Sequence, residues 1–187
     1  GNLFDPNDGV KDLENGKIEF IGDAEKRVKE DYLRILRYVR FFLSYSKLKH
    51  SDNTKKIVRK NIDGITNVSS ERLLEEFKKI INSSGALKLF NDPFCEEVIK
   101  LIFPQFKNFK VFKKLNYFAK KNFKEVDYIL LISLMIIDNS DNTEYFLYKF
   151  NLSKIEKKRI LFLKEFYLRK TDKNFFSKKN LWRILYY

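Results

Sequence analysis

The chain has 187 residues, 44% of them hydrophobic, so it can bury a substantial core in one domain or two small ones. Only 6 Gly and 3 Pro are present, which are too few turn-forming residues for a protein with many strands. One cysteine, Cys95, excludes an intramolecular disulfide and, by its count, any cysteine-based zinc site. We expect an all-α protein without a metal site in a reducing cytoplasm.

The formal net charge of +13 at pH 7 is unevenly spread. Residues 1–50 carry 10 basic and 9 acidic groups, whereas residues 151–187 carry 11 and 3. A basic end on a nearly neutral protein is typical of binding to a phosphate backbone. AT-rich coding, which enriches Lys, Asn and Phe, would produce the same excess without any functional meaning.

The first 22 residues are rich in turn signals and contain one alternating segment. In Lys17–Ile21 (KIEFI), Ile18 and Phe20 share one side, a pattern that predicts one short strand. A lone strand needs a partner, so we expect its pairing partners to lie upstream.

Three aspartates in this opening, Asp5, Asp8 and Asp12, do not have the spacing of a calcium-binding loop. We expect them to cap turns instead.

The next elements are predicted helices. An amphipathic pattern from residue 23 to about residue 48 predicts one long helix. A shorter helix is expected near residues 55–63, and another opens at SSERLLEEFKKII, where Ser69 can cap the first turn. Beyond Gly85 we expect four to six further helices. Tyr128–Ile137 (YILLISLMII) is too short to span a bilayer and predicts a buried helix.

Acidic and basic residues recur at offsets of three and four within the first long helix. On a helical wheel Arg27, Asp31 and Arg34 share one face, and Glu30 and Arg37 flank it. As a solvated salt ladder, the expected pairs Arg27–Asp31, Glu30–Arg34 and Asp31–Arg34 contribute only about 0.2–0.5 kcal/mol each. Alternatively, one Asp/Arg pair can read the Watson–Crick edge of a base, because the carboxylate accepts from an exocyclic amine and the guanidinium donates to ring acceptors. Spacing alone does not distinguish a salt ladder from a base-reading pair.

Other residues with functional chemistry have simpler interpretations. His50 has no Ser or Cys partner motif and is expected at a helix end, and Cys95 is expected in the core. Six aromatic residues could stack bases but have the helical spacing of core residues. They are Phe103, Phe106, Phe109, Phe112, Tyr117 and Phe118.

The basic residues of the C-terminal region are candidates for contacts with RNA phosphates, although clustered lysines are also common on a solvated face. These residues are Lys154, Lys157, Lys158, Arg159, Lys178 and Lys179.

The stretch DPNDGVKDLENGKIEFIGDAEKRVKEDYLRILRYVRFF (residues 5–42) resembles the bacterial (class II) tRNA nucleotidyltransferase/poly(A) polymerase family. The resemblance rests on a DPxxGxxDL motif from Asp5, an EDxxRxxR motif from Glu30, and an ERxxxE-type motif from Glu71. It covers roughly residues 4–82. The family commonly has arginine at the position of Glu19, which weakens any phosphate-handling role there.

The resemblance implies that Asp31 and Arg34 pair with the base of CTP and then of ATP. Glu30 is expected to orient Arg34, and Arg37 to lie near the nucleotide. Arg27 joins these nucleotide-binding residues because it shares their face. The implied organisation is a multi-helical all-α protein with a connector over residues 1–22 that holds the orphan strand or turn segment. A base-reading neck follows over residues 23–85, and a tRNA-binding body and tail over residues 86–187.

The family's chemistry resides in a head domain that has a Gly-rich stretch and a D-x-D pair for two Mg²⁺ ions. Neither motif occurs in these 187 residues. We therefore expect the neck, body and tail of a larger cytoplasmic enzyme that adds CCA to tRNA 3′ ends from CTP and ATP, without a membrane partner. This part alone is expected to be inactive.

Two other functions stay open. One is a poly(A) polymerase, or an enzyme that adds only C or only A. The other is a non-catalytic helical RNA-binding module. The sequence also leaves the oligomeric state open.

Overall fold

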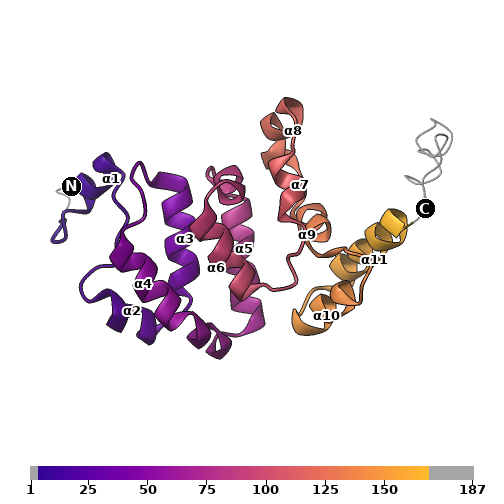
Figure 1. The fold of residues 1–187 in the computed structure, drawn as a ribbon, viewed down its shortest axis with the longest axis horizontal. Helices are drawn as coiled ribbons and strands as arrows, with labels where there is room; N and C mark the ends of the chain where they lie inside the picture. Colours follow the sequence, from indigo (N-terminus) through magenta and orange to yellow (C-terminus); the bar gives the residue numbers. More distant parts are fainter. Residues whose placement is uncertain (1–3, 169–187) are drawn as a thin grey trace.

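The computed structural model describes residues 4–168, and this part of the chain is all-α, as expected. It contains eleven α-helices and three 3₁₀ helices and no strand. In order these are α1 Gly9–Asn15, α2 Ala24–Glu30, α3 Arg34–Tyr45, α4 Asp52–Asn61, η1 Ile62–Asn67, α5 Ser70–Ile81, η2 Ala86–Phe90, α6 Pro93–Ile102, α7 Phe109–Lys113, α8 Tyr117–Lys121, η3 Phe123–Glu125, α9 Tyr128–Ile136, α10 Asn142–Lys149 and α11 Lys154–Leu168. Figure 1 shows an elongated molecule with α1 at one end and α11 at the other.

The strand predicted over residues 17–21 is wrong. The segment is not helical, but no neighbouring strand pairs with it in residues 4–168. Its alternation is real: Ile18 and Phe20 pack against the helical core while Glu19 is exposed, and the Phe20 ring stacks on Tyr38 at 5.4 Å between centroids. A segment that packs on helices can alternate buried and exposed side chains without hydrogen-bonding to a neighbouring strand. The alternating pattern alone therefore could not identify a strand.

A short helix, α1, lies where only turns were predicted. The Asp5 carboxylate accepts hydrogen bonds from the amides of Val10 (2.8 Å) and Gly9 (2.7 Å), which lower the pKa of Asp5. The capping role expected for Asp5 is thus confirmed. It is wrong for the other two aspartates, because the Asp8 side chain makes no capping bond and Asp12 lies within the helix. Gly16 ends the helix at φ 64°, and its carbonyl accepts from the Lys47 amide at 3.1 Å. This bond joins the opening segment to the end of α3.

The single long helix predicted from residue 23 is interrupted at Asp31. Helix α2 ends at Glu30, Asp31 is extended (φ −153°, ψ 102°), and α3 begins at Arg34. The Asp31 carboxylate accepts from the Leu33 amide at 3.1 Å, a local bond that competes with helical pairing. The motif residues therefore do not lie on one helical face.

One hydrophobic core runs from Val28 to Ile160, and its centre is aromatic. Four of the six aromatic residues considered above, Phe103, Phe106, Phe109 and Phe112, are buried as expected. The expectation is wrong for Tyr117 and Phe118, whose exposed fractions are 82% and 74%.

The remaining helix predictions hold. The helix expected near residues 55–63 is α4 followed by η1, and α5 begins after Ser69, whose hydroxyl accepts from the Arg72 amide. Helix α9 is largely buried. None of the helices in residues 4–168 is both long and apolar enough to cross a membrane.

Candidate nucleotide site

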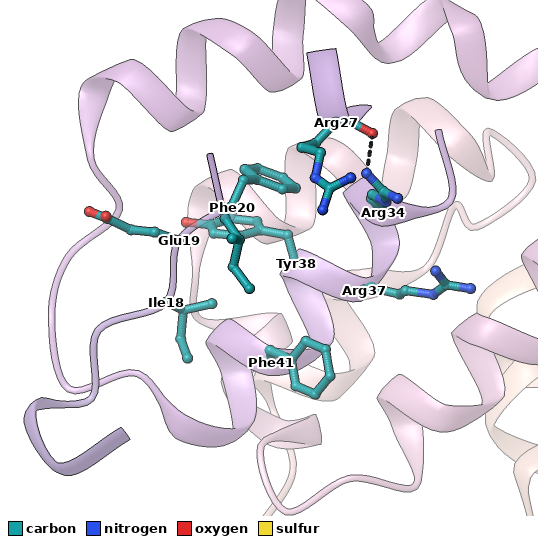
Figure 2. A pocket seen from close by; sticks show the side chains of 9 residues that line it. Ile18, Glu19, Phe20, Arg27, Arg34, Arg37, Tyr38 and Phe41 are labelled. Atoms are coloured by element: carbon teal, nitrogen blue, oxygen red, sulfur yellow. Dashed lines mark hydrogen bonds between the residues drawn. The ribbon is translucent and has the colours of Figure 1, made fainter. Parts of the chain in front are cut away.

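A cavity of 310 Å³ lies where the opening segment crosses α2 and α3 (Figure 2). The opening segment lines one side of it with four consecutive residues, 18–21, of which Glu19 is acidic. Tyr38 and Phe41 of α3 add aromatic rings to that of Phe20, and three arginines complete the lining. These arginines are Arg27, Arg34 and Arg37. Aromatic and aliphatic surface beside convergent guanidinium groups suits a flat ring that carries anionic groups.

Glu30 holds two of these arginines together. Its Oε2 accepts from Arg27 Nη1 at 3.0 Å and from Arg34 Nη1 at 2.9 Å. Arg34 Nη1 also donates to the Arg27 carbonyl oxygen at 2.9 Å, the dashed bond in Figure 2. The guanidinium groups of Arg34 and Arg27 lower the pKa of the Glu30 carboxyl. Glu30 is thus an ionised anchor that orients Arg34.

Asp31 belongs to a different group of contacts. Its carboxylate accepts from Arg37 Nη1 at 3.4 Å and from Arg72 Nη2 at 3.2 and 3.3 Å. Of the three predicted pairs, Glu30–Arg34 is formed, whereas in the described chain Asp31 pairs with neither Arg27 nor Arg34. The break at Asp31 explains this difference, because it turns the carboxylate toward α5.

Arg72 is the site residue that sequence reasoning missed. It lies 41 residues after Asp31 and reaches it from the first turn of α5. The signal was present in the ERxxxE-type motif, which carries part of the family resemblance but was assigned no site role from sequence. In the same motif Glu76, with an exposed side-chain fraction of 2%, accepts from Arg40 Nε at 2.6 Å. These two contacts fix α5 against α3.

Four of the six basic candidates of the C-terminal region lie on α11, at the opposite end of the molecule from the cavity (Figure 1). Lys154 and Lys158 are exposed, and Lys157 is half-buried. Arg159 is already engaged, because it donates to Asp127 at 2.9 and 3.4 Å and so ties α11 to the start of α9. Lys178 and Lys179 lie outside the described residues.

A second polar cluster joins the loop before α4 to α6. His50 bonds to the Tyr38 hydroxyl at 2.7 Å through Nδ1 and to the Asp92 carboxylate at 3.2 Å through Nε2. Burial alone would raise the pKa of Asp92, but hydrogen bonds from His50 and from the Cys95 amide lower it.

One ligand-type atom from each of His50, Asp92 and Cys95 lies within 4.8 Å of the others, so these residues could hold a metal ion. A single cysteine therefore does not exclude a mixed metal site that also uses histidine and carboxylate ligands. Burial raises the pKa of the Cys95 thiol, and the histidine and carboxylate are already paired with each other. The cluster thus serves here to join α3, α4 and α6.

Comparison with known proteins places the middle of the chain in a defined family. Residues 47–110 match the family model described as the probable RNA and SrmB-binding site of polymerase A. The chain is 33% identical over 137 residues to the CCA-adding enzyme of Lactobacillus johnsonii, covering 73% of this chain and 33% of that protein. It is 41% identical over 91 residues to the mitochondrial CCA tRNA nucleotidyltransferase 1 of Danio rerio, covering 46% of this chain and 21% of that protein.

The human mitochondrial CCA tRNA nucleotidyltransferase 1 is 42% identical over 83 residues, which are 43% of this chain and 19% of that protein. The chain thus spans a third or less of the length of these relatives. Over its N-terminal and middle region, the chain belongs to the tRNA nucleotidyltransferase and poly(A) polymerase family.

Proposed function

We propose that this chain selects the incoming base and helps to bind tRNA in an enzyme that adds CCA to tRNA 3′ ends. The observation that carries the proposal is the oriented Arg34 at a cavity with aromatic walls. The Asp31 carboxylate does not line this cavity, but it is bonded to Arg37, which does, and to Arg72. CTP and ATP are the proposed substrates and tRNA the proposed partner. The similarity to a CCA tRNA nucleotidyltransferase and to a CCA-adding enzyme supports this choice.

Arg34 has donors left for a ligand. Within the described chain, its contacts to Glu30 and to the Arg27 carbonyl use Nη1 alone, so Nε and Nη2 keep three N–H groups. Two parallel donors of a guanidinium match the adjacent O2 and N3 acceptors of cytosine. Arg34 is therefore the proposed reader of the acceptor side of the base.

Asp31 is the proposed acceptor for the exocyclic amine that cytosine and adenine share. Its oxygens already receive the Leu33 amide, Arg37 and Arg72. The contact to Arg37 is the longest, at 3.4 Å, so a base amine would displace Arg37 at the smallest cost. The released Arg37 would then be available to a triphosphate, which is the role proposed for it near the nucleotide.

The chemical step belongs to the complete protein. Mg²⁺, if bound by a D-x-D pair as in the family, would assist phosphoryl transfer there. The 187 residues contain no such pair, so no catalytic residue is assigned among them. The cytoplasm remains the proposed location.

The base-reading proposal is tested with Asp31→Ala and Arg34→Ala in the complete enzyme. Loss of either group should reduce the preference for CTP and ATP over UTP and GTP by about tenfold or more, since a good bidentate base contact contributes about 1–3 kcal/mol of discrimination. The measurement is incorporation of each labelled nucleotide into a tRNA transcript that lacks CCA. Asp52→Ala is the control, because in the described chain this exposed aspartate pairs with Lys55 and lies outside the cavity.

Unchanged selectivity in both variants would reduce the motif to a salt ladder. The products of the unmodified enzyme separate the remaining functions. Addition of C, C and A supports the proposal, whereas adenylate runs or a single nucleotide type indicate the two related activities. Binding of the tRNA without any incorporation would indicate a non-catalytic RNA-binding module.

A further inference from the structure

Two neighbouring aromatic side chains project from α8. Tyr117 is 82% exposed and Phe118 is 74% exposed, although each belongs to a chain that buries most of its phenylalanines. Figure 1 shows α7 and α8 standing away from the line of the other helices. Large aromatic side chains left in water on a projecting element indicate a surface that contacts something else.

Lysines flank these two rings in the sequence. Residues 98–124 contain eight lysines and no acidic residue, the densest basic stretch outside the C-terminal region. Lys100 and Lys113 pair with Glu96. The other six are exposed and make no ion pair within the described part of the chain. They are Lys107, Lys110, Lys114, Lys120, Lys121 and Lys124.

We propose that residues 107–124, the lysine-aromatic arm, bind unpaired RNA by stacking bases on Tyr117 and Phe118 while the lysines contact phosphates. Stacking on aromatic side chains inside a basic surface is how proteins bind single-stranded nucleic acid without sequence preference. The matched RNA-binding region ends at residue 110, so it does not include the two rings. The inference rests on the proposed function for its choice of RNA as the ligand.

The geometry favours RNA over an apolar partner. Consecutive residues of an α-helix point about 100° apart, so Tyr117 and Phe118 do not form one flat apolar face. A membrane or a protein groove requires a continuous apolar stripe, and α8 has only five residues. Separate rings can each accept one base, and the lysines on either side of them in the sequence complement the phosphates that link the bases.

The experiment compares the binding of two labelled RNAs by fluorescence anisotropy. One is a tRNA transcript that lacks CCA, and the other is a short unstructured oligonucleotide. Tyr117→Ala/Phe118→Ala should weaken oligonucleotide binding by about tenfold or more, given the usual contribution of base stacking. Tyr148→Ala on α10 is the matched control, because Tyr148 is 88% exposed and lies outside the arm. Tyr117→Trp/Phe118→Trp should retain binding, because indole also stacks.

The lysines are tested through salt. Lys120→Gln/Lys121→Gln should reduce the slope of log K against log salt by about 0.7 for each single-strand phosphate that is no longer neutralised. Equal oligonucleotide affinity of the alanine variant and the unmodified chain would overturn the inference and leave the base-reading proposal intact. Loss of self-association or protein binding without loss of RNA binding would also overturn it. No RNA binding by the unmodified chain would remove both the inference and the proposed tRNA partner.

Discussion

The pair between Arg40 and Glu76 is the most buried ion pair described between helices α3 and α5. Glu76 is almost fully enclosed, and the Arg40 guanidinium also lies 4.3 Å from the centre of the Phe41 ring. Enclosure removes the water that would solvate a lone carboxylate, so the two charges depend on each other. The pair also holds α5 where Arg72 can reach Asp31.

Arg40→Ala should therefore lower the free energy of unfolding by up to about 3 kcal/mol, because it leaves the buried Glu76 carboxylate with only its 3.4 Å contact to the exposed Lys79. Arg59→Ala removes an exposed pair with Glu97 and should cost less than about 1 kcal/mol. Urea unfolding of both variants checks the difference. Equal, small decreases would mean that water reaches Glu76.

The residues of the EDxxRxxR motif were predictable from sequence, but Arg72, the aromatic lining of the cavity and the pairing of the charges were not. Glu30 and Arg34 form the contact expected from their spacing. Asp31 does not, because its side chain bonds to the Leu33 amide and ends α2, and an aspartate before two apolar residues is a weak signal for such a turn. Arg72 comes from another helix, and no local sequence pattern predicts its contact with Asp31, 41 residues away.

Between the helices, Gly85 allows an unusually close approach. A Cβ at this position would overlap the carbonyl group of Leu43, near the end of α3, so η2 can lie against that helix only with glycine there. From sequence, the position indicates a helix stop and a boundary. Its structural role is a contact between backbones, which a turn signal does not reveal.

Gly85→Ala should lower the free energy of unfolding by about 1–3 kcal/mol, because backbone must shift to admit the methyl group. Gly9→Ala is the comparison, since its Cβ would meet only the Asp5 side chain at 3.3 Å. Thermal unfolding of the two variants measures the effect. A Gly85→Ala protein as stable as the Gly9→Ala protein would contradict the close packing.

Elements with strong local signals were predicted well. Helix α5 has a capping serine and a regular apolar pattern, and α9 is apolar throughout. The opening segment was predicted poorly, because the Asp5 carboxylate starts a helix among turn residues and because Ile18 and Phe20 pack on helices rather than in a sheet. A local side-chain bond decided the first case, and tertiary contacts decided the second.

Across the whole molecule, positive charge is concentrated away from the cavity. The exposed lysines of α11 and of the lysine-aromatic arm lie in the half of the chain that follows α6. The residues around the candidate nucleotide cavity, in contrast, have acidic and basic groups in close pairs. Charge therefore separates a region suited to phosphate backbones from one suited to reading a single base.

Binding of tRNA by the chain should weaken steeply as salt rises, because each neutralised phosphate releases counterions. Lys154→Gln/Lys158→Gln should lower the slope of log K against log salt by about 0.7–0.9 for each phosphate that these lysines neutralise. Arg159→Gln should instead reduce stability, because Arg159 pairs with Asp127. Filter binding over a salt series measures the slopes. A salt-independent affinity would count against phosphate contacts.

The contact between Asp31 and Arg72 also constrains how this protein can diverge over generations. Replacing Asp31 alone would leave Arg37 and Arg72 facing each other without their shared counter-charge. Replacing Arg72 alone would remove one of the two cations that hold the carboxylate. Residues joined in this way have non-additive effects. Lineages of this family should therefore keep or exchange the two positions together, as a linked pair that joins motifs 41 residues apart.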